Sequence, residues 1–95
     1  MQTIGKYDLN NRMHLSAIIC QLVEQPQHGC LQIFSGSMSW TLYIEEGKLI
    51  YATYSDNMFE LMYKKLKQLS MQISSISSDI YKRLLSRFEA ALEPQ

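Results

Sequence analysis

Residues 40–53 constrain the fold of this chain more than any other stretch. They read WTLYIEEGKLIYAT, two segments rich in aromatic and β-branched residues around a short polar turn that ends in glycine. This pattern predicts a β-hairpin. We place the turn on the three residues Glu45, Glu46 and Gly47, with Gly47 in the left-handed conformation as a bulge. A two-residue turn would force Glu46 to a positive φ, which glutamate resists.

The register of this hairpin decides which side chains share a face. With a three-residue turn, one face carries Trp40, Leu42, Ile44, Ile50, Ala52 and Tyr54, and the other carries Thr41, Tyr43, Leu49, Tyr51 and Thr53. The alternative register pairs Glu45 with Lys48 and exchanges the two faces of the second strand. In both registers each face holds large apolar groups. The sheet therefore needs cover on both sides, or a partner on one.

The rest of the chain reads as helices around one further strand. Asn10 or Asn11 is placed to cap the first helix. Apolar side chains at helical spacing predict helices near 11–24, near 57–69 and from about 71 or 75 to 92. Residues 30–34 read as a strand, and short connections between three strands favour an antiparallel meander.

These elements predict a small α+β fold with an N-terminal helix, a three-stranded antiparallel β-meander and two C-terminal helices. The predicted domain spans residues 11–93, and residues 1–10 are expected to form a flexible arm because they show little periodicity. At 95 residues the chain has the length of one domain.

Composition excludes several classes of function. The formal net charge is zero, which makes nucleic acid an unlikely partner, although residues 60–87 hold six basic and two acidic residues, a net charge of +4. Cys20 and Cys30 form no metal-binding spacing with the two histidines. No apolar run approaches the length of a membrane span and no signal peptide opens the chain. We therefore expect a cytoplasmic protein with no membrane insertion.

The sequence contains no recognisable catalytic constellation. The serines between Ser70 and Ser78 have no histidine nearby, and the glycines are isolated, so no phosphate-binding loop is present. Glu45 and Glu46 are adjacent on a predicted hairpin tip, where two carboxylates cannot enclose a substrate. We expect a protein that is not an enzyme and that carries no cofactor or metal.

Part of the sequence resembles a known family. The matching residues are Gly29-Cys30-Leu31-x-Ile33, followed by Trp40-x-Leu42-Tyr43-x-x-x-Gly47-x-Leu49-Ile50-x-Ala52-Thr53. This pattern, with a preceding helix and the stripe from Phe59 to Leu69, is similar to the PATAN domain. PATAN is the N-terminal domain of cyanobacterial PatA-type response regulators, and the resemblance covers most of residues 10–90.

The resemblance implies signal transduction by protein contact. PATAN proteins are similar to regulators of phototaxis and cell patterning in two-component systems, and some contact the motor ATPase of type IV pili. They usually carry a phospho-acceptor receiver domain, but the three aspartates of this sequence include no receiver-like acidic cluster. Control by phosphorylation is therefore not expected from these residues.

The predicted binding surface is the second face of the hairpin together with the basic helix that follows. Tyrosine suits a half-exposed contact surface because its ring gives area while its hydroxyl stays hydrated. We expect a protein partner there: a signalling protein such as the pilus motor ATPase, or a second copy of the chain. The alternative is a nucleic-acid-binding module that uses the basic helices 57–92. The candidate residues are Tyr43, Leu49, Tyr51, Lys64, Lys65 and Lys67.

Overall fold

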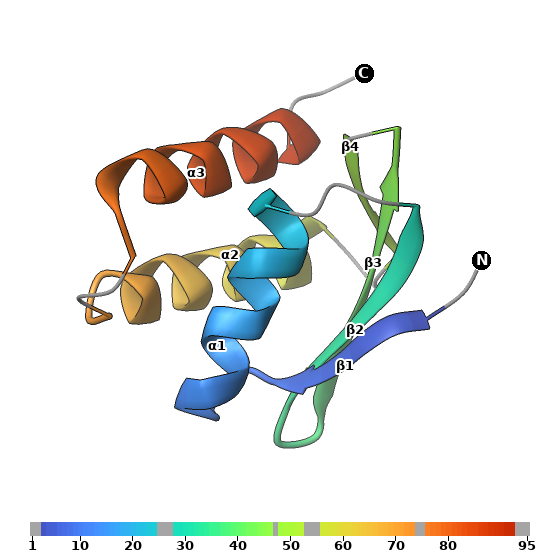
Figure 1. Cartoon of the computed structure of the whole chain (residues 1–95). Coiled ribbons are helices and arrows are strands. Elements are labelled where there is room, and N and C mark those ends of the chain that lie inside the picture. The colour runs from blue at the N-terminus through green and yellow to red at the C-terminus, as the bar shows by residue number, and fades with distance from the viewer. Residues whose placement is uncertain (1–2, 25–27, 47, 53–55, 74–75, 93–95) are drawn as a thin grey trace.

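The protein is an α+β structure in which one mixed sheet carries all of its helices on one face (Figure 1). The computed structural model describes residues 3–24, 28–46, 48–52, 56–73 and 76–92. The strands stand in the order β1-β2-β3-β4 across the sheet. The elements are β1 (Thr3–Asp8), α1 (Arg12–Ile19), η1 (Cys20–Glu24), β2 (Gly29–Ser35), β3 (Met38–Glu45), β4 (Lys48–Ala52), α2 (Asp56–Ser70) and α3 (Ser78–Leu92).

The predicted three-stranded antiparallel meander is wrong, because a fourth strand lies at the N-terminus. β1 pairs with β2 in parallel, so the segment that we expected to be a flexible arm, residues 1–10, contributes an edge strand. Parallel neighbours need a long crossover, and α1 with η1 supplies it. The Tyr7 ring packs against Gly5, where a Cβ atom would make the end of the ring shift.

The register of the hairpin is also different from our first choice. Glu45 pairs with Lys48, and Ile44 pairs with Leu49. This is the alternative register, and it exchanges the two faces of β4. The turn places Glu46 at φ 51°, the left-handed conformation that we expected glutamate to avoid. Gly47, to which the prediction assigned that conformation, lies outside the described residues.

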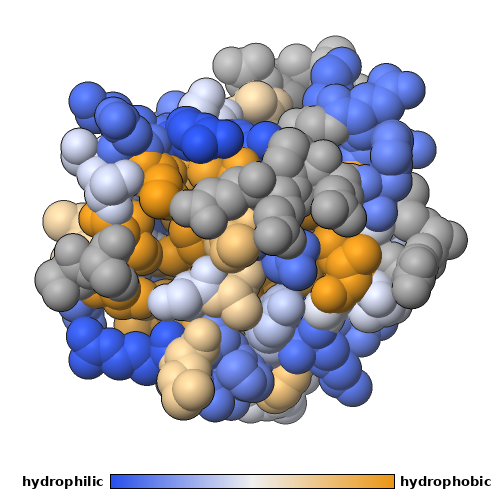
Figure 2. Space-filling model, viewed as in Figure 1, coloured by the Kyte–Doolittle hydropathy of each residue, from blue (hydrophilic) through white to orange (hydrophobic). Residues whose placement is uncertain are grey.

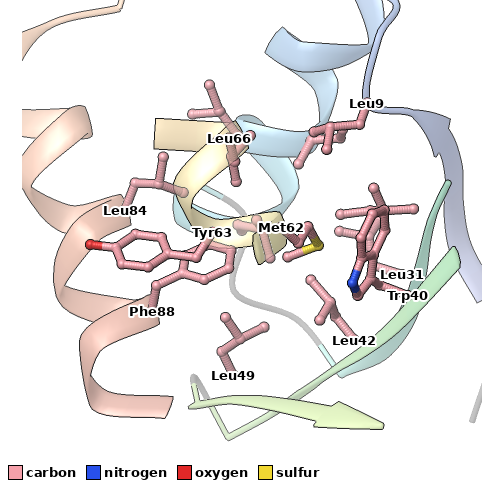
Figure 3. Close-up of a cluster of buried hydrophobic side chains, with 14 of the residues drawn as sticks. Leu9, Leu31, Trp40, Leu42, Leu49, Met62, Tyr63, Leu66, Leu84 and Phe88 are labelled. Carbon is pink, nitrogen blue, oxygen red and sulfur yellow. The ribbon is translucent and has the colours of Figure 1, made fainter. Parts of the chain in front are cut away.

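The core fills the space between the sheet and the helices. Trp40 and Leu42 on β3 and Leu49 on β4 point toward Met62 of α2 and Phe88 of α3 (Figure 3), and each is at most 7% exposed. The Trp40 indole N–H donates to the carbonyl oxygen of Met58 at 2.9 Å. This bond satisfies the polar edge of a ring that is otherwise enclosed by apolar atoms.

A stack of four aromatic rings joins β4, α2 and α3. Tyr51 stacks on Phe59 with centroids 4.0 Å apart, Phe59 on Phe88 at 5.4 Å, and Phe88 on Tyr63 at 5.0 Å. Burial, and then the nearby Glu89 carboxylate, raises the pKa of the Tyr63 hydroxyl. The hydroxyl therefore stays protonated and donates to Glu89 Oε1 at 3.4 Å. The stack fixes α3 against the sheet.

The helix ends follow the predicted capping chemistry in part. Asn11 caps α1, since its side-chain oxygen accepts from the amides of Met13 and His14, as predicted. The third helix begins at Ser78, later than predicted, because Ser77 Oγ accepts from the Ile80 amide and so acts as its cap.

The C-terminal end of η1 is held by a side chain of α3. Arg83 donates to the carbonyl oxygen of Val23 at 3.0 Å. A guanidinium there complements the helix dipole.

The strained turn gives a test of the register. Replacing Glu46 with asparagine, which tolerates positive φ, should stabilise the protein by roughly 0.5–1 kcal/mol in a denaturant titration. Glu45→Asn is the control: Glu45 is an exposed strand residue, so this change should leave stability the same or slightly lower. A destabilised Glu46→Asn variant would contradict the two-residue turn.

Candidate functional site

The face of the sheet that points away from the helices is the candidate site. Successive side chains of a strand point to opposite faces, and the inward set includes Leu31, Leu42 and Leu49. In Figure 1 the three helices lie on that same side. We call the opposite side the outer face. Its members on β2, β3 and β4 are Cys30, Gln32, Phe34, Ser39, Thr41, Tyr43, Glu45, Lys48 and Ile50.

The centre of the outer face is uncharged and partly apolar. Tyr43 lies between Cys30 on β2 and Ile50 on β4, and Ile50 is 45% exposed. Phe34 and Thr41 are partly buried. A shallow hollow of about 510 Å³ lies near the β2–β3 turn and includes Phe34 and Thr41 in its lining. This part of the face therefore presents aromatic and methyl groups for apolar contacts, with hydroxyl and amide groups beside them for hydrogen bonds.

Charged residues occupy two opposite corners of the outer face. Lys6 and Asp8 on β1 stand beside Gln32 and Phe34 of β2. Glu45 and Lys48 pair at the hairpin tip, at the other end of the strands. Among the described residues the one ion pair within 4.0 Å joins Lys64 and Glu60 on α2, so these four charges form no salt bridge with each other within the chain.

The structure separates the three hairpin residues that the sequence placed on one surface. Tyr43 is on the outer face and partly buried. Leu49 is 7% exposed in the core, and Tyr51 is stacked on Phe59. The prediction that all three form one binding patch is therefore wrong, because it rested on the three-residue turn.

The three predicted lysines also point to different surroundings. Lys64 forms an exposed ion pair with Glu60 at 3.7 Å. Lys65 is partly buried and donates to Ser35 Oγ at 2.9 Å, whereas Lys67 lies 5.0 Å above the ring of Tyr63. They do not form one basic patch, and of the three only Lys65 joins two elements, α2 and β2.

Ser35 and Lys65 could be taken for a nucleophile and its base, since a serine–lysine pair can catalyse acyl transfer. The contacts favour a structural role. Ser35 is 5% exposed, and its Oγ also accepts a hydrogen bond from the side-chain amide of Asn10 at 2.9 Å. The hydroxyl therefore joins the β1–α1 turn, the end of β2 and α2 in one place.

The sequence prediction missed Phe34 as a site residue, placed Thr41 correctly beside Tyr43, and put Ile50 on this face only in the alternative register. The alternation of β2 contained a usable signal, because Leu31 and Ile33 share one face of a strand and Phe34 therefore falls on the other. The four large apolar side chains most exposed in the described residues are Met13, Ile50, Leu61 and Met71. Of these, Ile50 alone lies on the sheet. On the helical side, apolar surface shows between the helices and is bordered by polar residues (Figure 2).

Two further observations describe the site's surroundings. In the described part of the chain, no helix is long and apolar enough to cross a membrane. Within the same residues, no three His, Cys, Asp or Glu side chains gather closely enough to hold a metal ion.

Comparison with known proteins adds no family. No family model matches the sequence, and no solved structure gives a significant match.

The two hairpin tyrosines should respond differently to the same substitution. Tyr51→Ser removes a partly buried ring that is stacked on Phe59 and should cost about 2–3 kcal/mol of unfolding free energy. Tyr43→Ser, on the uncovered face, should cost less than about 1 kcal/mol. Urea titrations of both variants measure the difference. Equal losses, or a larger loss for Tyr43→Ser, would show that the faces of β3 and β4 are assigned incorrectly.

Proposed function

We propose that this chain is a non-enzymatic protein-interaction module that binds its partner through the outer face of the sheet. One observation carries the proposal: the helices α1, α2 and α3 cover the same face, which leaves Phe34, Tyr43 and Ile50 on a face that no helix of the described residues covers. An uncovered apolar patch on a small protein usually marks a binding site.

The chemistry of the outer face supports a protein as the partner. Interfaces between proteins have an uncharged core that is enriched in aromatic residues, surrounded by a polar rim. The outer face has this arrangement, with Tyr43 near the middle and the charges of Lys6 and Lys48 at the border. Tyr43 contributes a large area at a small entropic cost because its ring has few rotatable bonds.

The resemblance to PATAN supports a role in signalling. The residues that carry it, from Gly29 to Thr53, include the outer-face members Cys30, Tyr43 and Ile50. We propose that the module works in the cytoplasm in a two-component system of the cyanobacterial type, where it affects pilus motility, phototaxis or cell patterning. A type IV pilus motor ATPase and other signalling proteins are the partners that this resemblance implies.

Nucleic-acid binding through the basic helices is the weaker alternative. Phosphate contacts need cations that are free to meet the backbone. Lys65 and Arg83 instead donate to groups of the chain itself, and Lys67 lies over Tyr63.

Site-specific photo-crosslinking tests the proposal in a cyanobacterial host. Tyr43→benzoylphenylalanine places the reactive group on the outer face, and Leu61→benzoylphenylalanine is the control. Leu61 lies on α2 and is 47% exposed, almost the same as Ile50. We expect protein adducts from position 43 well above those from position 61, with a signalling protein or a second copy as the adduct identified by mass spectrometry. Equal adducts from both positions, or adducts with nucleic acid alone, would overturn the proposal.

A further inference from the structure

The charges of the outer face are arranged so that the face is complementary to itself. On the β1 corner Lys6 is followed, two residues on, by Asp8; at the opposite corner Glu45 on β3 stands beside Lys48 on β4. Each corner carries one positive and one negative charge. The net charge of each corner is therefore zero. A partner matches a corner only if it places a negative charge opposite the lysine and a positive charge opposite the carboxylate.

From this arrangement we infer that the outer face binds the outer face of a second copy of the chain, related by a two-fold axis that lies between the two sheets. This inference rests on the proposed function and names its partner. A two-fold axis makes the same patch meet itself. When the axis runs diagonally across the strands, it exchanges the β1 corner of one copy with the hairpin corner of the other. The two sheets then cross at about 90°, a recognised packing geometry.

The strand pairing fixes which residues meet. Strands are spaced by about 4.8 Å and residues along them by about 3.3 Å, so the paired residues form a grid on the outer face. The diagonal axis brings Lys6 of one copy opposite Glu45 of the second copy, and Asp8 opposite Lys48. Thr41 falls close to the axis and meets its own counterpart.

The same two-fold rotation also brings uncharged groups of the two copies into favourable contacts. Ile50 of one copy comes close to Phe34 of the second copy, so the half-exposed aliphatic side chain covers a ring. Tyr43 comes opposite Gln32, and an amide is a suitable hydrogen-bond partner for a phenol hydroxyl. An uncharged centre with alternating charges at its ends is the arrangement expected for specific pairing.

The size of the face sets the strength of the dimer. Four strands of about seven residues give roughly 450 Å² for each copy. The total is at the low end of interface areas, where transient complexes are found. We therefore expect a reversible dimer with a dissociation constant in the micromolar range or weaker.

Charge reversal tests the pairing directly, with sedimentation equilibrium at low ionic strength as the measurement. Lys6→Glu and Glu45→Lys each put like charges opposite one another twice in the dimer, so each variant alone should dimerise roughly 10-fold more weakly than the wild type. An equimolar mixture of the two variants restores both pairs, because Glu at position 6 of one copy meets Lys at position 45 of the other. The mixture should form dimers as the wild type does.

The intramolecular explanation is excluded by this design. Within one copy the two positions are about 16 Å apart by strand spacing, so they do not pair, and mixing two different chains cannot repair a contact within either. Glu60→Lys, on α2, is the control and should leave dimerisation unchanged, since Glu60 pairs with Lys64 away from the sheet. All three variants change exposed residues and should stay folded; Glu45→Lys should lower the melting temperature slightly, since it places a lysine opposite Lys48.

A cysteine trap gives an independent readout. Thr41→Cys, near the axis, should yield a disulfide-linked dimer under mild oxidation, whereas Ser39→Cys should remain at the wild-type level, although Ser39 is the more exposed residue. A chain that stays monomeric at millimolar concentration, or a mixture that stays as weak as the single variants, would overturn self-pairing. If position 43 still crosslinks to another protein in that case, the proposed function stands and only the identity of the partner is wrong.

Discussion

The pairing of Glu45 with Lys48 is the constraint on which the rest of this structure depends. It decides that β4 offers Leu49 and Tyr51 to the core and leaves Ile50 outside. Holding a glutamate at positive φ costs about 1–2 kcal/mol. Burying a large apolar side chain stabilises the folded state by about 1.5–3 kcal/mol. The competing register would turn Ile50 and the small Ala52 inward instead of Leu49 and Tyr51. Burial therefore outweighs the strain of the turn.

This register also positions the helices, because the aromatic stack begins at Tyr51 of β4. Because Tyr51 faces the helices, Phe59 of α2 has a ring to stack on, and Phe88 of α3 lies between Phe59 and Tyr63 of α2. The helices are thereby committed to one face of the sheet. Lys65 and Arg83 join different elements through hydrogen bonds, although their charge alone would predict solvent-exposed side chains. The outer face is what remains uncovered, and its uncharged centre and corner charges follow from the strand alternation.

Much of the local structure was predictable from the sequence, but its assembly was not. The hairpin, the Asn11 cap and the positions of α1 and α2 follow from periodicity and capping chemistry, which are local. β1 was missed because Ile4 and Tyr7 do not alternate as strand residues should, and the structure places a register shift between Thr3 and Gly5. The register of the hairpin was missed because turn propensity was weighed without the core that overrides it. The site inherited that error: Tyr43 was placed correctly on the uncovered face, whereas Leu49 and Tyr51 were not.

The register of the hairpin can be tested on two neighbouring side chains of β4, Leu49 and Ile50. A soluble paramagnetic agent relaxes the NMR signals of methyl groups that it can approach, and a dilute sample keeps the chain monomeric. We expect strong relaxation of the Ile50 methyl groups, which are on the outer face, and protection of the Leu49 methyl groups, which are in the core. Strong relaxation of Leu49 with protection of Ile50 would contradict the register, and with it the outer face on which both proposals rest.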